Sequence, residues 1–273
     1  EPAATPEPIL RVRLRRLLGT TLLGLGHTDP CMRVTEEGME LLGQPLPVSS
    51  EQLVAKLLPQ LLAQGARQLQ QRLGGRPPLP VFDPALSPEQ GREALGLLAA
   101  QAEVALYLFS DRRLFFCSLA LANLADRLND TAQRVISYGA LAYTATTLGL
   151  SAAARLYLEQ ADALRKTVPG TGAEFKFLRL RGSIHVSHGR LDEAEADLRQ
   201  ARAIAAAIGD TTSQLVALQQ LVWIAIFRSR LDASSPDLQA HLQLAEHESH
   251  SQFVPRARVS QAQVLQQAGK HRE

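Results

Sequence analysis

The stretches Gly149-Leu150-Ser151-Ala152-Ala153-Ala154 and Gly189-Arg190-Leu191-Asp192-Glu193-Ala194 both begin with glycine, end with alanine and lie 40 positions apart. A fixed period of this length, with glycine at a turn and small residues at close contacts, is typical of an array of helical hairpins. The same ladder of apolar residues follows each stretch: Leu158, Ala161 and Leu164 after the first, and Leu198, Ala201 and Ile204 after the second.

The amino-acid composition also favours helices. Apolar residues make up 45% of the 273 residues but aromatic residues only 5%, so leucine and alanine supply most of the interior. Both are strong helix formers, and alanine lets two backbones approach closely. Runs of β-branched residues bounded by turns, which predict strands, are scarce. The sequence therefore predicts an all-α protein.

Helix starts and turns repeat with the same period. A capping residue followed three positions later by Gln or Glu predicts helix starts at Asp130, Thr171 and Thr211. Because caps, turns and the apolar ladder agree, we expect one helix pair in each period. The predicted turns lie 40 residues apart, at Gly149, Gly189, Ser229 and Gly269.

The N-terminal part matches this pattern as well. Residues 9–25 read as an amphipathic helix, and the turn that starts at Gly26 resembles the turn at Gly189. Gly19 precedes its turn by seven residues, as Gly182 does, so residues 9–43 predict one hairpin. Ser49 and Gln52 predict the start of a further helix that runs to about Arg72, and Pro59 is expected to kink or split it.

These patterns predict four segments. Residues 1–8 form a linker or disordered start, and residues 9–72 form an N-terminal helical segment with one hairpin. Residues 73–86 form an excursion rich in proline and glycine. Residues 87–273 form the repeat array, which starts at the Ser87 cap and is truncated at its C-terminal end. Since the chain has no initiator Met, we expect it to be a piece of a longer protein.

One period of the array resembles the tetratricopeptide repeat. The matching residues are Gly182, Gly189, Leu191, Ala194, Leu198 and Ala201. The chain departs from that repeat at Arg181 and His185, and its period is 40 residues instead of about 34. It is more similar to the longer repeats of large bacterial signalling ATPases, namely LuxR-type regulators and fusions of an ATPase to a cyclase or kinase. Residues 38–47 also resemble the stretch after the ATPase module of such fusions.

The resemblance implies a right-handed superhelical array of antiparallel hairpins, that is, a tetratricopeptide-like α-solenoid. In such an array the first helix of each pair lines a concave, partner-binding face. Tryptophan and arginine often anchor interfaces, so this face is the predicted binding surface, although Trp223 and Ile226 alternatively pack between helices. The residues implied for it are Tyr143, Thr146, Arg179, Ser183, Val186, Gln219, Trp223 and Ile226.

No motif for catalysis or for a cofactor is found. Gly269-Lys270 lacks the other residues of a phosphate-binding loop, and no kinase catalytic loop, nucleophile elbow or zinc-protease motif is present. His241, His247 and His250 have spacing that allows a metal site, but a polar helix end explains them better. His185 and His188 are interpreted as helix-terminal residues instead of a catalytic pair. We therefore predict no enzyme activity, no cofactor and no metal.

The net charge and the cysteine content limit the classes of partner and the compartment that we expect. The net charge of +2 predicts neither a nucleic-acid nor a membrane partner, and no apolar run has the length of a membrane span. The arginines between Arg11 and Arg16 are interpreted as a solvated face instead of a phosphate site. Cys31 and Cys117 are expected to be buried thiols in a reducing, cytoplasmic compartment.

Two functions are compatible with these observations. The first is a non-catalytic scaffold that recognises a protein partner, or another domain of the same chain, within a larger bacterial signalling protein. The second is a regulatory domain that senses a small effector and controls an attached ATPase, cyclase, kinase or DNA-binding module. A tight pocket with convergent polar groups favours the sensor, whereas a broad groove favours the scaffold.

Overall fold

The computed structural model describes residues 8–47, 49–73, 86–108, 110–228, 235–248 and 252–267. Within these ranges only the backbone of residues 50, 70–73 and 267 is described. The predicted excursion at residues 73–86 lies almost wholly outside the described residues, as do residues 1–7, His250 and the predicted turns at Ser229 and Gly269.

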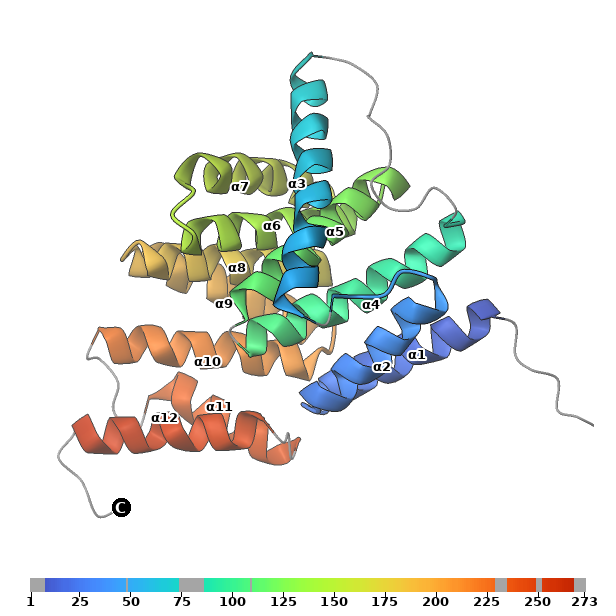
Figure 1. The fold of residues 1–273 in the computed structure, drawn as a ribbon. Helices are drawn as coiled ribbons and strands as arrows, with labels where there is room; N and C mark the ends of the chain where they lie inside the picture. Colours follow the sequence, from blue (N-terminus) through green and yellow to red (C-terminus); the bar gives the residue numbers. More distant parts are fainter. Residues whose placement is uncertain are drawn as a thin grey trace, which may run out of the picture. The chain divides into compact units, whose positions relative to one another are not determined.

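The described residues form helices and no strands, which confirms the all-α prediction (Figure 1). None of these helices has both the length and the apolar character that crossing a membrane requires. Their bounds are α1 Pro8–Gly24, α2 Thr28–Leu41, α3 Ser50–Leu73, α4 Pro88–Tyr107, α5 Asp111–Leu128, α6 Thr131–Thr147, α7 Ser151–Arg165, α8 Gly172–Ser187, α9 Leu191–Ala207, α10 Thr211–Phe227, α11 Pro236–His247 and α12 Phe253–Gln267.

The chain divides into two compact units. The first contains residues 1–160, with α1 to α6 and the start of α7, and the second contains residues 161–273. In the first unit α1 packs on α2, α4 on α5, and α3 on α5. In the second unit α8 packs on α9, and α10 packs on both α9 and α11.

The hairpins α1–α2 and α8–α9 share one contact register. An added Cβ at Gly19 comes within 2.6 Å of Thr35, and one at Gly182 comes within 3.1 Å of Leu198. In each hairpin the two contacting residues lie 16 positions apart. Glycine is needed at both positions because any side chain there separates the paired helices. The predicted equivalence of Gly19 and Gly182 is therefore confirmed.

The predicted turns at Gly26, Gly149 and Gly189 are confirmed. The φ angles of these glycines are +83°, +72° and +71°, in the left-handed region that residues with a Cβ rarely adopt. The amide of Arg190, just after Gly189, returns to the carbonyl of His185 at 2.9 Å and so closes the end of α8. The turns at Gly149 and Gly189, and the starts of α7 and α9 that follow them, lie 40 residues apart.

The capping pattern is confirmed with one correction. Ser87 and Gln90 form a reciprocal capping box at the start of α4, and Asp130 and Thr171 cap α6 and α8. For α10 the cap is Asp210, not Thr211. One oxygen of the Asp210 carboxylate accepts a hydrogen bond from the Ser213 amide, and the other accepts one from the Ser213 hydroxyl. Thr211 has only one side-chain oxygen.

The expected split at Pro59 does not occur, because α3 runs as one helix from Ser50 to Leu73. Proline removes the hydrogen bond that its own N–H would give to the carbonyl of Ala55. Both Pro59 and Ala55 are exposed, so water can satisfy that carbonyl. The helix therefore continues at modest cost.

The two cysteines are free thiols buried in the first unit, as predicted. Burial raises the pKa of Cys31 to about 11 and that of Cys117 to about 12, because a thiolate is poorly solvated there. Cys117 belongs to a core of α1, α2, α4 and α5 that includes Val12, Met39 and Leu121. Both thiols are therefore expected to be unreactive in the folded chain.

Candidate functional site

The helix α3 buries its polar side. Gln60, Gln64, Arg67 and Gln68 lie at i, i+4, i+7 and i+8, which places them on one face of the helix. Their exposed fractions are 7%, 1%, 8% and 9%. In an ordinary amphipathic helix of a globular protein, the buried stripe is apolar. This arrangement is not among the features that the sequence predicts.

A carboxylate on α5 holds the arginine of this polar face. Arg67 Nη1 lies 2.9 Å from Asp126 Oδ2, and Arg134 Nε of α6 lies 3.0 Å from Oδ1 of the same carboxylate. The Tyr138 hydroxyl donates to Asp126 Oδ1 at 2.7 Å. Only 3% of the Asp126 side chain is exposed, so two ion pairs and one hydrogen bond compensate a carboxylate that is removed from water.

These groups also affect Tyr138. Burial is the largest cause that raises the pKa of Tyr138, and the charge of Asp126 adds to it, because both disfavour a phenolate. The Tyr138 hydroxyl therefore remains protonated and keeps donating to Asp126. Its ring also packs on Tyr157, with the ring centroids 5.8 Å apart.

Four side-chain amides complete the contact. The Asn123 side chain of α5 donates to Gln60 Oε1 at 2.7 Å, and Arg67 donates to the Asn123 carbonyl at 3.1 Å. Gln68 and Gln160 exchange hydrogen bonds of 3.1 and 2.7 Å. We call the set of Gln60, Arg67, Gln68, Asn123, Asp126 and Gln160 the α3 polar network.

The opposite side of α3 is apolar and exposed. The exposed fractions of Val54, Leu58, Leu61, Leu62 and Leu69 are 63%, 60%, 42%, 65% and 58%. No residue of this exposed face is charged between Val54 and Leu69. We call it the α3 apolar face, and its residues are Val54, Ala55, Leu58, Pro59, Leu61, Leu62, Gly65, Ala66 and Leu69.

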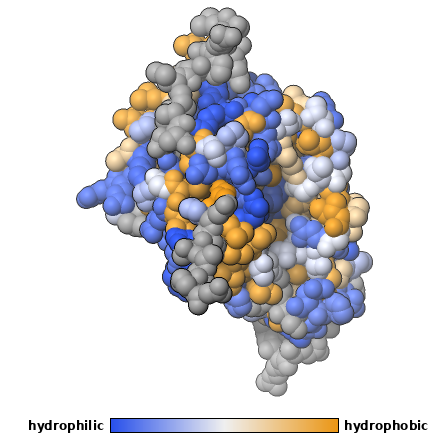
Figure 2. All heavy atoms as spheres, turned by 90° about the vertical axis from the view of Figure 1, so that its right-hand side faces the viewer, coloured by the Kyte–Doolittle hydropathy of each residue, from blue (hydrophilic) through white to orange (hydrophobic). Residues whose placement is uncertain are grey.

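This polarity is inverted relative to a solvent-facing helix. Single exposed leucines are normal on a protein surface, but a contiguous uncharged apolar face marks an interaction site. In Figure 2, apolar side chains interrupt the hydrophilic surface on the side of the molecule that the view shows. The polar network fixes which side of α3 faces outward, so the apolar face is built into the fold.

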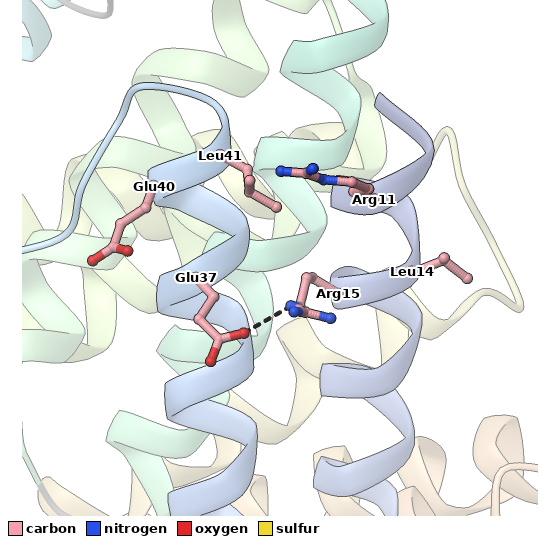
Figure 3. Close-up of a pocket in the computed structure, with 6 residues that line it drawn as sticks. All are labelled: Arg11, Leu14, Arg15, Glu37, Glu40 and Leu41. Atoms are coloured by element: carbon pink, nitrogen blue, oxygen red, sulfur yellow. Dashed lines mark ion pairs between the residues drawn. The ribbon is translucent and has the colours of Figure 1, made fainter. Parts of the chain in front are cut away.

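A second apolar strip lies on α1, but it is bordered by charges. Leu10, Leu14, Leu17 and Leu18 are 43% to 50% exposed. A cavity of about 630 Å³ lies between α1 and α2, next to this strip, and Figure 3 shows the residues that line it. Its lining residues are Arg11, Leu14, Arg15, Glu37, Glu40 and Leu41.

The charged groups of this cavity do not converge on its centre. Arg15 Nε pairs with Glu37 Oε2 at 2.7 Å, whereas the Glu40 side chain points away from α1 (Figure 3). A site for a small charged effector needs polar groups that aim at one point. The cavity is therefore a shallow groove between helices and not a formed effector pocket.

The arginine cluster of α1 is partly structural and not only a solvated face. Arg13 and Arg16 hydrogen-bond to Glu93 of α4 at 3.0 and 2.6 Å. Burial opposes ionisation of Glu93, but these two hydrogen bonds hold its pKa below the usual value. The expectation of a purely solvated run is thus wrong for Arg13 and Arg16, because each ties α1 to α4.

Most of the residues predicted for the concave face contact neighbouring helices. Arg179 and Gln219 are each 3% exposed, and Gln219 donates to Ser260 of α12 at 3.3 Å. Ser183 accepts from Gln220 of α10 at 3.0 Å, and Val186 packs in the cluster of α8, α9 and α10. The burial of Arg179 and Gln219 does not fit an open, hydrated groove at these two positions.

The remaining predicted residues are half-buried. Tyr143 packs against the core of the first unit, and the Thr146 hydroxyl donates to the carbonyl of Ala142 at 2.8 Å. Trp223 and Ile226 are partly exposed on α10. Tyr143 and Thr146 belong to the first unit and the other six residues to the second. Their role in binding stays a prediction.

Two departures from the repeat pattern form a pair network in the second unit. Arg181 donates two hydrogen bonds to Asp197, at 2.7 and 2.6 Å, and one to Asp162 at 2.7 Å. His185 Nε2 lies 3.6 Å from Asp197. Arg181 thus makes a bidentate ion pair between α8 and α9.

The predicted histidine group does not come together among the described residues. His241 is completely buried, whereas 82% of the His247 side chain is exposed. No cluster of potential metal ligands occurs in the described ranges. His241 packs edge-on against Phe253, so it is a core residue of α11 and α12.

Comparisons with known proteins add no assignment. The chain matches no protein-family model, and the search for similar curated proteins found no match. The functional argument therefore depends on the geometry of α3 and its neighbours.

Proposed function

We propose that this chain is a non-catalytic scaffold of tetratricopeptide-like hairpins, which recognises a protein partner or another domain of its own polypeptide. The shared register of α1–α2 and α8–α9 supports the repeat assignment, because both hairpins place glycine at the same crossing point. Stacking of such hairpins into a right-handed superhelix is part of this proposal.

The single observation that carries the proposal is the apolar face of α3. Complete burial of a valine or leucine side chain contributes roughly 1.5–3 kcal/mol. Five such side chains, each 42% to 65% exposed, therefore give several kcal/mol of driving force for a protein that covers them.

The α3 polar network makes this face a stable feature of the first unit. Rotating α3 to bury Leu58 and Leu62 would break the buried Arg67–Asp126 ion pair and the hydrogen bonds that link Asn123 to Gln60 and Arg67. An unpaired buried charge costs about 3–5 kcal/mol, so the rotated arrangement is disfavoured. The helix thus presents its apolar side outward and offers a preorganised surface.

The alternative sensor function receives less support. The cavity of Figure 3 pairs Arg15 with Glu37 instead of presenting both groups to a ligand. A broad apolar helix face suits a protein surface better than a small effector, because it has few polar groups to fix an orientation.

A photo-cross-linking experiment tests recognition. Benzoylphenylalanine replaces Leu62 on the apolar face or, as a control, exposed Arg112 at the start of α5. The full-length protein is irradiated in cells, and the attached peptides are identified by mass spectrometry. We expect protein adducts from position 62 and few from position 112. Equal, background-level adducts from both positions would contradict the proposal.

The non-catalytic part has its own assay. The purified chain is incubated with ATP and magnesium, and phosphate release is compared with that of a heat-denatured sample. We expect no difference. Phosphate release that requires the folded chain would show an activity that the proposal excludes.

A further inference from the structure

Six residues of the α3 apolar face keep the same spacing when the helix is read in either direction. A two-fold axis that crosses the helix between Leu61 and Leu62 exchanges three pairs of positions: Val54 with Leu69, Leu58 with Gly65, and Leu61 with Leu62. All six residues are exposed. Two copies of α3 placed antiparallel about this axis therefore bring exposed apolar positions opposite one another.

The sizes of these residues are complementary across the axis. No atom lies within 4 Å of a Cβ added at Gly65, so the helix has an open notch there. Leu58, its counterpart, is 60% exposed and forms a projecting side chain. In an antiparallel pair each Leu58 enters the notch at Gly65 of the other copy, as a knob enters a hole.

The charges agree with the same arrangement. The apolar face is uncharged, so two copies meet without repulsion along a seam of about 22 Å. Antiparallel helices also place opposite ends of their dipoles together.

We propose that the α3 apolar face binds a second copy of this chain through an antiparallel α3–α3 contact. This inference rests on the proposed function and specifies the partner. The face is isologous, which means that the same residues contribute on both sides. The contact is smaller than a standard protein interface unless neighbouring elements join it, so we expect a dimer that dissociates on dilution.

Sedimentation equilibrium of the purified chain, from roughly 1 µM to roughly 100 µM, measures this dimer. We expect a concentration-dependent dimer for the native sequence and a monomer for Leu62→Glu. Leu62 is 65% exposed, so the thermal unfolding of the variant should match that of the diluted native chain. A native chain that stays monomeric, or a dimer that persists in Leu62→Glu, would overturn the proposal.

A second set of variants tests the register. Leu58→Glu should weaken the dimer at least about tenfold, because it places a carboxylate in the apolar notch. Adding Gly65→Lys in the same chain places a cation opposite that carboxylate and should recover part of the affinity. Leu58→Glu with Val54→Lys has the same charges in the wrong register, so it should show no recovery. If the two double variants dimerise with equal affinity, the proposed two-fold axis between Leu61 and Leu62 is wrong.

This test separates the two proposals. If the native chain is monomeric while position 62 still cross-links to a different protein or to another domain, the second-copy inference is wrong and the recognition function remains. If the chain is monomeric and position 62 gives only background adducts, both are wrong.

Discussion

Arg67 of α3 and Asp126 of α5 form an ion pair of 2.9 Å in which 10% and 3% of the two side chains are exposed. This pair, together with Arg134 and Tyr138, fixes the rotation of α3 about its own axis. The rotation in turn places Leu58, Leu61, Leu62 and Leu69 on the outer side of α3, and Gln60, Gln64 and Gln68 on its buried side.

Removal of the shared carboxylate should destabilise the first unit. Asp126→Ala leaves two arginines and a tyrosine hydroxyl without their acceptor, and we expect a loss of about 3–5 kcal/mol. Urea unfolding followed by circular dichroism measures it. The control is Arg15→Ala, which removes the Arg15–Glu37 pair, where the side chains are 43% and 52% exposed. That variant should lose less than about 1 kcal/mol. Similar losses in both variants would argue against a buried network.

The α8–α9 crossing should not tolerate a larger residue. A Cβ at Gly182 comes within 3.1 Å of Leu198 and 3.5 Å of the Ala194 carbonyl, so Gly182→Val forces the two helices apart. We expect a loss of about 1–3 kcal/mol in the free energy of unfolding. Gly172→Val is the matched control, because no atom lies within 4 Å of its Cβ position. Trp223, the only tryptophan, reports on this unit by fluorescence. Equal stability of the two variants would show that the crossing is loose.

The buried His241 should make the second unit sensitive to acid. Burial and, to a smaller extent, the charge of the nearby Arg256 lower the pKa of His241 from 6.5 to about 4. As the pH falls, His241 therefore takes up a proton in the unfolded chain at a higher pH than in the folded chain. The free energy of unfolding should have its full value above about pH 6.5. It should then fall progressively, by roughly 3 kcal/mol, as the pH decreases towards 4.

The matching measurement compares urea unfolding at pH 7 and pH 5 by Trp223 fluorescence. His241→Phe keeps an aromatic ring without a titrating group, so its stability should change less between these two values. An identical pH dependence in the variant and the native chain would assign the acid sensitivity to other groups.

The sequence predicted the hairpins well because their signals are local. Glycines at Gly149 and Gly189 with positive φ, and caps at Ser87 and Asp130, act within a few residues of themselves. These signals determine where a helix ends, whichever elements it later contacts. The period therefore predicted the starts of α6, α8 and α10 correctly to within one residue.

The packing of α3 was not predicted because helical periodicity does not say which face is buried. The polar stripe at Gln60, Gln64 and Arg67 and the apolar stripe at Leu58 and Leu62 are both visible in the sequence. The usual expectation buries the apolar stripe. Here the partners of the polar stripe, such as Asp126, are more than 50 residues away, and no local pattern links them to α3.

The burial of the residues predicted for the concave face was not predicted either, for the same reason. The repeat pattern places Arg179 and Gln219 on equivalent positions of α8 and α10 but does not show what packs on them. Ser260 of α12, which accepts from Gln219, lies beyond the helix pair that the period describes. Burial at these positions is a tertiary effect.

The orientation of α3 is the central claim, and cross-linking within one chain tests it most directly. Gln68→Cys with Gln160→Cys places two thiols where the native side chains exchange hydrogen bonds of 3.1 and 2.7 Å. Leu69→Cys with Gln160→Cys is the control, since Leu69 lies on the exposed side. Cys31 and Cys117 are buried and should not interfere at neutral pH. A short thiol-specific cross-linker in dilute solution should join residues 68 and 160 efficiently and residues 69 and 160 poorly. The reverse order would mean that α3 buries its leucines, and the account of its outward apolar face would then be wrong.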